Sequence, residues 1–112
     1  MSAAADFRRL ALDLPGASEG AHMGHADFRA NGRIFASLGS PDADHAMVQL
    51  SPEEQAMRVE AAPQVFFPAP GAWGRAGSTR VRLAAADEAT LVGALACAHA
   101  AALAKPRGRS KA

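Results

Sequence analysis

Five arginines stand close to the predicted strands, and a guanidinium group is the side chain that best holds a phosphate, through two parallel hydrogen bonds. They are Arg29, Arg33, Arg75, Arg80 and Arg82. Gathered on the solvent side of a sheet, such residues could contact the phosphate backbone of a nucleic acid. The alternative is a solvated strand face whose arginines pair with acids such as Asp27 or Glu19.

The distribution of charge limits how strongly the chain could bind nucleic acid. Four of the twelve basic residues lie in the segment 105–112, which leaves eight basic residues against eleven acidic ones in the rest of the chain. We therefore expect any DNA binding to be weak, salt-sensitive and poorly sequence-specific, with added affinity from the tail. The residues that we expect to make the phosphate contacts are Arg33, Arg75, Arg80 and Arg82.

A histidine pair with a nearby carboxylate offers the ligand types that zinc or iron prefers. His22 and His25 are three residues apart, so in a straight strand they point to opposite faces unless the chain bends at Gly24. His25 and Asp27 are two residues apart and share a face, which predicts a structural hydrogen-bonded pair and no metal site. The segment 42–45 lacks the spaced carboxylates of a calcium loop and predicts a solvated turn.

Trp73 is the single tryptophan, and it stands between a proline-rich segment and the glycines of residues 74–77. These glycines lack the spacing of a phosphate-binding loop, so we predict a hairpin or loop tip. Trp73 either anchors this tip or is exposed to a partner. The alternative function is thus a module that binds a protein or a small ligand through Trp73 and the proline-rich segment. With no tyrosine and only Cys97 as a thiol, we predict no enzyme and no cofactor.

Helices are predicted at both ends of the chain, because apolar residues recur there every three or four positions. The residues of the two apolar stripes are Phe7, Leu10, Ala11 and Leu14, and Leu91, Val92, Leu95, Ala98 and Leu103. We expect the first helix over about 3–14, ended by Pro15, and the last helix to begin after Asp87 as its cap. Ser51-Pro52 predicts the start of a third, short helix.

Antiparallel strands are predicted between these helices. Asn31-Gly32 is typical of a tight type I′ hairpin turn, and further strands are expected over 46–50 and 79–83. In the last of these, Val81 and Leu83 alternate with arginines, which predicts one buried face and one wet face. The segment with Phe66 and Phe67 precedes two prolines, so we expect it at a sheet edge or in a bridging loop.

These elements predict an α+β fold, in which an antiparallel sheet has the N- and C-terminal helices packed on one face. The length fits a single domain over residues 1–104, followed by a basic tail over 105–112 that we expect to be disordered. No stretch is long and apolar enough for a membrane span, and the first residues do not resemble a signal peptide. We therefore expect a cytoplasmic protein.

The order and spacing of six segments resemble the MmcQ/YjbR family from about residue 7 to residue 105. The segments are Leu12-Asp13-Leu14-Pro15-Gly16, Gly24-His25-Ala26-Asp27-Phe28-Arg29, Gly32-Arg33-Ile34-Phe35-Ala36, Leu50-Ser51-Pro52-Glu53-Glu54, Pro68-Ala69-Pro70-Gly71-Ala72-Trp73-Gly74 and Val81-Arg82-Leu83. The resemblance implies a frataxin-like (CyaY-like) α+β arrangement. It also implies DNA binding, because the paired hairpins of the family look like two wings.

Overall fold

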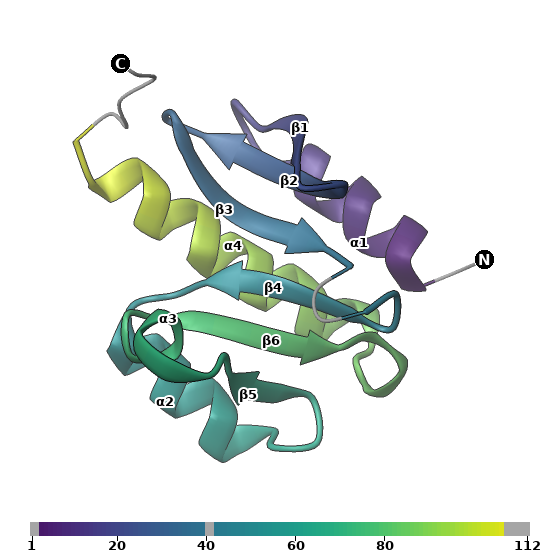
Figure 1. Ribbon diagram of the computed structural model, residues 1–112, viewed down its shortest axis with the longest axis vertical. Helices are drawn as coiled ribbons and strands as arrows, with labels where there is room; N and C mark the ends of the chain where they lie inside the picture. The colour runs from purple at the N-terminus through teal and green to yellow at the C-terminus, as the bar shows by residue number, and fades with distance from the viewer. Residues whose placement is uncertain (1–2, 40–41, 107–112) are drawn as a thin grey trace.

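The computed structural model describes residues 3–39 and 42–106. Within these residues, six strands form one antiparallel sheet in the order β1-β2-β3-β4-β6-β5. The elements are α1 (Ala3–Leu12), β1 (Ser18–His22), β2 (His25–Ala30), β3 (Arg33–Leu38), β4 (His45–Gln49), α2 (Pro52–Ala61), β5 (Phe66–Pro68), α3 (Gly71–Arg75), β6 (Ser78–Arg82), the 3-10 turn η1 (Leu83–Ala85) and α4 (Glu88–Ala104). Figure 1 shows their arrangement.

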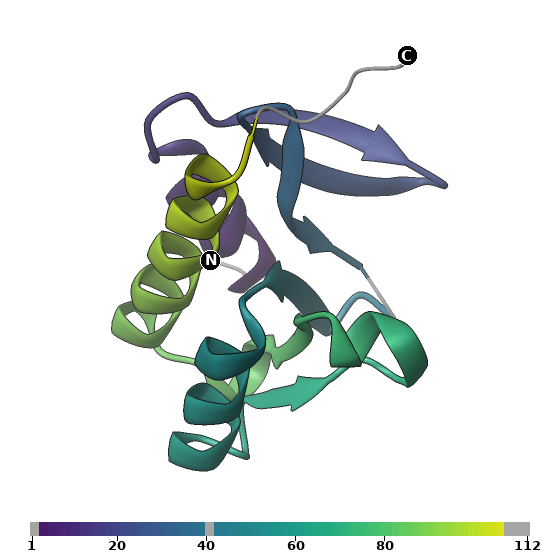
Figure 2. The ribbon, with the colours of Figure 1, turned by 90° about the vertical axis from the view of Figure 1, so that its left-hand side faces the viewer.

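The helices divide the sheet into a covered face and an open face. Helices α1, α2 and α4 lie on one side of the sheet, and the β1–β2 hairpin and α3 project on the other side (Figure 2). Helix α4 contacts β2, β3 and β4, and α1 packs against α4. The predicted α+β fold with both terminal helices on one face is therefore confirmed.

The core lies between the sheet and the helices. Its largest fully buried apolar side chains are Phe7, Phe28, Phe35, Phe66, Val48, Val81, Leu91 and Leu95. The predicted alternation in β6 is confirmed, because Val81 is fully buried while Arg80 is half-buried and Arg82 is exposed. Leu83, just beyond the strand, is buried as well. Burial of these side chains removes apolar surface from water and is the main source of stability.

Tight turns join the first three strands. Asn31 and Gly32 have φ values of 57° and 72°, so the predicted hairpin turn between β2 and β3 is confirmed. A second turn of the same kind joins β1 and β2 at Met23 and Gly24, with φ values of 51° and 80°. Sequence reasoning missed this turn, because methionine rarely adopts a positive φ.

The predicted helix starts are confirmed in atomic detail. The Oγ of Ser51 accepts a hydrogen bond from the backbone N–H of Glu54 at 3.1 Å, and Pro52 occupies the first turn of α2. The Oδ1 of Asp87 accepts from the backbone N–H of Thr90 at 2.8 Å at the start of α4. Each cap satisfies an N–H group that has no partner inside its helix.

Three predictions about the helices need correction. Helix α1 ends at Leu12, so Leu14 lies beyond it. Val92 and Leu103 are 46% and 51% exposed, so they do not belong to the buried stripe of α4. The predicted loop tip around Trp73 is the short helix α3.

Most of the predicted tail, residues 107–112, lies outside the described residues.

Candidate functional site

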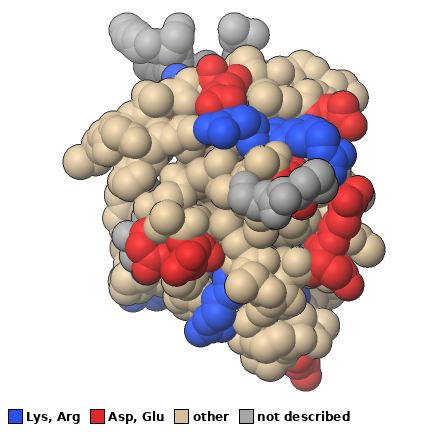
Figure 3. Space-filling view, turned by 90° about the vertical axis from the view of Figure 1, so that its right-hand side faces the viewer, with Lys and Arg blue, Asp and Glu red and all other residues tan. Residues whose placement is uncertain are grey.

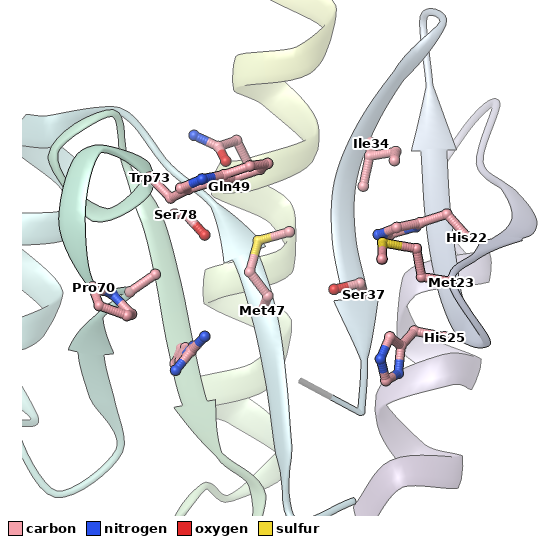
Figure 4. Close-up of a pocket in the computed structure, with 12 residues that line it drawn as sticks. His22, Met23, His25, Ile34, Ser37, Met47, Gln49, Pro70, Trp73 and Ser78 are labelled. Atoms are coloured by element: carbon pink, nitrogen blue, oxygen red, sulfur yellow. The ribbon is translucent and has the colours of Figure 1, made fainter. Parts of the chain in front are cut away.

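A hollow of about 520 Å³ lies on the open face of the sheet. Its lining comes from the β1–β2 hairpin, strands β3, β4 and β6, α3 and the segment before α3. The lining residues are His22, Met23, His25, Ile34, Ser37, Met47, Gln49, Ala69, Pro70, Trp73, Ser78 and Arg80. The volume lies within the range of about 300–1,000 Å³ that is usual for small-molecule sites. Figure 4 shows the side chains pointing into the hollow from both sides.

Two strongly exposed apolar side chains stand on opposite walls of the hollow. Met23 is 91% exposed at the β1–β2 turn, and Trp73 is 77% exposed on α3. Figure 4 places Met23 with His22 and His25 on one side and Trp73 with Pro70 on the other. Large exposed apolar groups on a concave surface are typical of a binding site, because nothing in the monomer removes them from water.

The floor of the hollow is set by the strand register. Ser37 lies opposite Met47, and Met47 lies opposite Arg80, so these three side chains form a row across β3, β4 and β6. In the next row, Gln49 lies opposite Ser78. The floor thereby presents a guanidinium, an amide and two hydroxyls, and the hairpin wall adds the imidazoles of His22 and His25, beside the apolar side chains of the hollow. A few polar groups placed among apolar ones are expected for a site that orients a ligand.

The wall that carries Trp73 is held close to the sheet by two glycines. A Cβ atom on Gly74 would lie 1.8 Å from the carbonyl oxygen of Ala69, and one on Gly77 would lie 1.8 Å from that of Leu50. The buried side chain of Gln55 secures the same segment from the covered side, where its Nε2 donates to the carbonyl oxygens of Gly74 and Ser78 at 3.0 and 3.1 Å. These glycines therefore serve close packing of α3.

The opposite wall, the β1–β2 hairpin, is held by a buried carboxylate. Asp27 is fully buried and accepts hydrogen bonds from Nε and a terminal nitrogen of Arg29 at 2.7 and 3.0 Å. The Nδ1 of His22 lies 2.8 Å from Oδ2 of Asp27, the oxygen that also accepts from the terminal nitrogen of Arg29. The hydrogen bond from Arg29 is the main cause that holds the pKa of Asp27 below its usual value, against the opposing effect of burial. Gly20, opposite Asp27, leaves room for this pair.

The predicted pair of His25 and Asp27 is wrong. The partners of Asp27 are His22 and Arg29. The β1–β2 turn also places His22 directly opposite His25, so the two imidazoles share a face that a straight strand would not give them. Across residues 3–39 and 42–106, no three His, Cys, Asp or Glu side chains are grouped to hold a metal ion.

The structure separates the four arginines that were predicted to contact phosphate. Arg80 lies in the hollow, and Arg75 is exposed on α3. Arg33 lines a second hollow of about 240 Å³ near the end of α4, where it donates to the carbonyl oxygen of Pro106 at 3.1 Å. Arg82 lies over the ring of Phe67 at 4.2 Å. Only Arg80 thus joins Trp73 in the main hollow.

These four arginines nevertheless share one property. None of them makes an ion pair within the described ranges. The other four arginines there, Arg8, Arg9, Arg29 and Arg58, each pair with an acid. Within the described residues, the predicted alternative of pairing with Asp27 or Glu19 is confirmed for Arg29, which pairs with Asp27, and for none of the other four strand arginines. The partner of Glu19 is Arg8 on α1. On the side shown in Figure 3, basic and acidic side chains are interspersed.

Sequence reasoning missed most of the hollow. Met23, Ile34, Met47 and Gln49 have no chemical signature that separates them from ordinary strand residues. Only the register brings them together with Trp73, which was predicted, so no local pattern could have identified the set.

Comparison with known proteins supports the fold. A family model, YjbR, matches residues 12–100. The crystal structure of a Deinococcus radiodurans protein with the domain DUF419 superposes with a TM-score of 0.76 at 18% identity, covering 94% of this chain and 81% of that one. No curated protein matches the sequence. In the described part of the chain, no helix is long and apolar enough to cross a membrane. Because the family model spans most of its length, the chain belongs to the YjbR family.

Proposed function

We propose that this chain is a cytoplasmic binding protein without catalytic chemistry, and that its ligand occupies the hollow on the open sheet face. One observation carries this proposal: Trp73 and Met23 are exposed on facing walls of the hollow (Figure 4). Arg80, whose side chain makes no ion pair with the described residues, lines the same hollow. The free thiol of Cys97 fits a reducing compartment.

The residues of the hollow define the chemistry of the ligand. The guanidinium of Arg80 makes no hydrogen bond or ion pair with residues 3–39 or 42–106, so its charge is available to an anionic group. Trp73, Met23 and Met47 offer apolar surface that a ring or chain of the ligand could cover. A ligand with one anionic end and one apolar body would satisfy both parts of the site.

The tryptophan provides a direct assay. Trp73 is the single tryptophan and the chain has no tyrosine, so its emission reports on the hollow alone. We expect anionic aromatic compounds such as 3-phenylpropionate or thymidine monophosphate to change this emission, and Arg80→Gln to weaken the effect. The matched control is Arg9→Gln, which removes an ion-paired arginine on α1. Compounds that bind by calorimetry without changing the emission would place the site elsewhere.

Weak binding of duplex DNA is a second candidate function. It is supported by the four arginines that make no ion pair in the described residues, namely Arg33, Arg75, Arg80 and Arg82. Because a guanidinium without an acidic partner attracts phosphate, each could contact the backbone of DNA. The acidic excess of residues 1–104 keeps this binding weak, and the basic segment 105–112 would add affinity.

The salt dependence of duplex binding tests the second candidate. We expect the affinity of the full chain for a short duplex to fall steeply as the salt concentration rises. Replacing Arg75 or Arg82 by glutamine should each reduce the slope of log affinity against log salt concentration by about one. The variant that lacks residues 105–112 should bind more weakly but measurably. Complete loss of binding on this deletion would show that the folded domain does not contact DNA.

A further inference from the structure

We propose that the hollow binds a nucleotide unit, with the base against Trp73 and the phosphate on Arg80. This inference rests on the proposed function and names the ligand class of the same site. It follows from three features of the hollow that together match a nucleotide: an exposed ring, a guanidinium that makes no ion pair with the described residues, and polar groups in the floor that can still form hydrogen bonds. Each feature matches one part of the ligand.

The exposed indole of Trp73 provides the stacking surface. Trp73 is 77% exposed and its side chain extends from the wall formed by α3, so its ring is open to a base. Stacking on an aromatic side chain stabilises any of the bases, because every base has a flat face. Met23, on the facing wall, is flexible enough to close over a ring of varying size.

The guanidinium of Arg80 provides the anion contact. Arg80 lies on β6, half-buried at the floor of the hollow, and its position there is set by the pairing with Met47. None of the described residues that line the hollow is acidic, and the buried carboxylate of Asp27 in the adjoining hairpin is already held by Arg29 and His22. The positive charge of Arg80 is therefore not neutralised from within the hollow.

The polar groups of the floor favour a nucleobase over a purely apolar ring. Ser37 and Ser78 make no side-chain hydrogen bond within the described ranges, and both hydroxyls face the hollow in Figure 4. Gln49 uses its Nε2 to donate to the carbonyl oxygen of Ala76 at 3.0 Å, which leaves its carbonyl oxygen free to accept. An apolar ring would cut these groups off from water without replacing their hydrogen bonds, whereas the edge of a base carries donors and acceptors.

The shape of the site favours an unpaired nucleotide over a duplex. The hollow has the size of a small-molecule site and is flanked by the β1–β2 hairpin and α3, which both project from the sheet (Figure 2). In a duplex, the flat faces of the bases are stacked on one another and are not accessible to Trp73. The ligand is thus either a free nucleotide or one position of a single strand.

The experiment combines Trp73 emission with the anisotropy of a fluorescein-labelled oligothymidylate. The full chain is titrated at low salt with the oligothymidylate, its duplex with oligoadenylate, thymidine monophosphate and 3-phenylpropionate. We expect the single strand to quench Trp73 and the duplex to leave its emission unchanged. Thymidine monophosphate that competes as strongly as the strand identifies a free nucleotide as the ligand, whereas much weaker competition identifies the strand.

Variants locate the two contacts. Both Trp73 variants lack the fluorescent residue, so their binding is measured by the anisotropy of the labelled oligothymidylate. Trp73→Ala should weaken this binding about tenfold, and Trp73→Phe should retain most of the affinity because a phenyl ring still stacks on a base. Arg80→Gln should weaken binding and lower the slope of affinity against salt by about one, while Arg9→Gln should leave both unchanged. Since Trp73 and Arg9 are exposed and Arg80 is half-buried, circular dichroism should show that all four variants fold.

Several outcomes would overturn the nucleotide assignment. If 3-phenylpropionate quenches Trp73 and the thymidine compounds do not, the hollow binds another class of ligand and only the further inference fails. If the duplex binds as tightly as the single strand and leaves the Trp73 emission unchanged, the protein contacts DNA phosphates outside the hollow, and the nucleotide assignment is wrong. If no compound changes the emission and Arg80→Gln has no effect, the proposed ligand site falls as well.

Discussion

Replacing the buried carboxylate of the β1–β2 hairpin should destabilise the protein measurably. Asp27→Asn conserves shape but removes the charge that accepts two hydrogen bonds from Arg29 and contacts His22. Hydrogen bonds to a charged group contribute about 1.5–3 kcal/mol each, and a buried pair that loses one partner costs about 3–5 kcal/mol. Since the side chains of Arg29 and His22 are 45% and 46% exposed, water can solvate them in the variant. We therefore expect a loss of about 2–3 kcal/mol in the free energy of unfolding.

The dependence of this loss on pH tests its electrostatic origin. The pKa of Asp27 is lowered in the folded protein, chiefly by Arg29, so the carboxylate stabilises the fold above its unfolded-state pKa of about 3.9. That contribution disappears as the pH falls through the lower folded-state pKa. The difference in the free energy of unfolding between the wild-type protein and Asp27→Asn should thus have its full size from about pH 5 to 7 and become smaller below about pH 4.

Urea denaturation followed by circular dichroism at several pH values measures both effects. The matched control is Asp42→Asn, because Asp42 also lies 2.7 Å from a histidine nitrogen but is 59% exposed. We expect this control to change the unfolding free energy much less, since water screens the exposed pair. Unchanged stability of Asp27→Asn at neutral pH, or a deficit that persists unaltered in acid, would refute the electrostatic account.

Three further substitutions test the packing around the hollow and the helices. Gly77→Ala should lower the free energy of unfolding, measured by urea denaturation, by about 3 kcal/mol and should alter Trp73 emission. The reason is that the φ of Gly77 is 108° and the new Cβ would meet the carbonyl oxygen of Leu50. A variant as stable as the wild-type protein would contradict this close approach. Ser51→Ala should lower the free energy of unfolding, measured by the same method, by about 1 kcal/mol, because it removes the cap of α2. An unchanged free energy of unfolding would mean that water replaces the cap. Val92→Lys should change stability by less than about 0.5 kcal/mol because Val92 is exposed, and a larger loss would indicate that a partner covers α4.

Local chemistry in the sequence was enough to predict most of the elements. Asn31-Gly32 specified a hairpin turn because few residue pairs accept positive φ at both positions. Ser51 and Asp87 specified helix starts because their side chains satisfy backbone N–H groups two or three residues away. The alternation around Val81 specified which face of β6 is buried, because successive side chains of a strand point to opposite faces. Each of these signals acts within a few residues.

Periodicity failed where the residues did not differ enough in polarity. Helix α4 has Glu88 as its only charged residue, so many choices of buried face agree with the sequence, and Val92 and Leu103 were assigned to the wrong one. Only packing against β3 and α1 selects the face that contains Leu91 and Leu95. A helix that is apolar on all sides carries no preference of its own for one face.

The candidate site was decided by tertiary structure. The sequence identified Trp73 and Arg80 as residues able to bind a ligand, but it assigned them to different functions. The β4–β6 register and the short helix α3 bring both into one hollow, and the β1–β2 turn adds Met23 from a segment about fifty positions away. Residue types thus determined which chemistry the protein can offer. Long-range strand pairing, which no local pattern encodes, determined which of those residues act together.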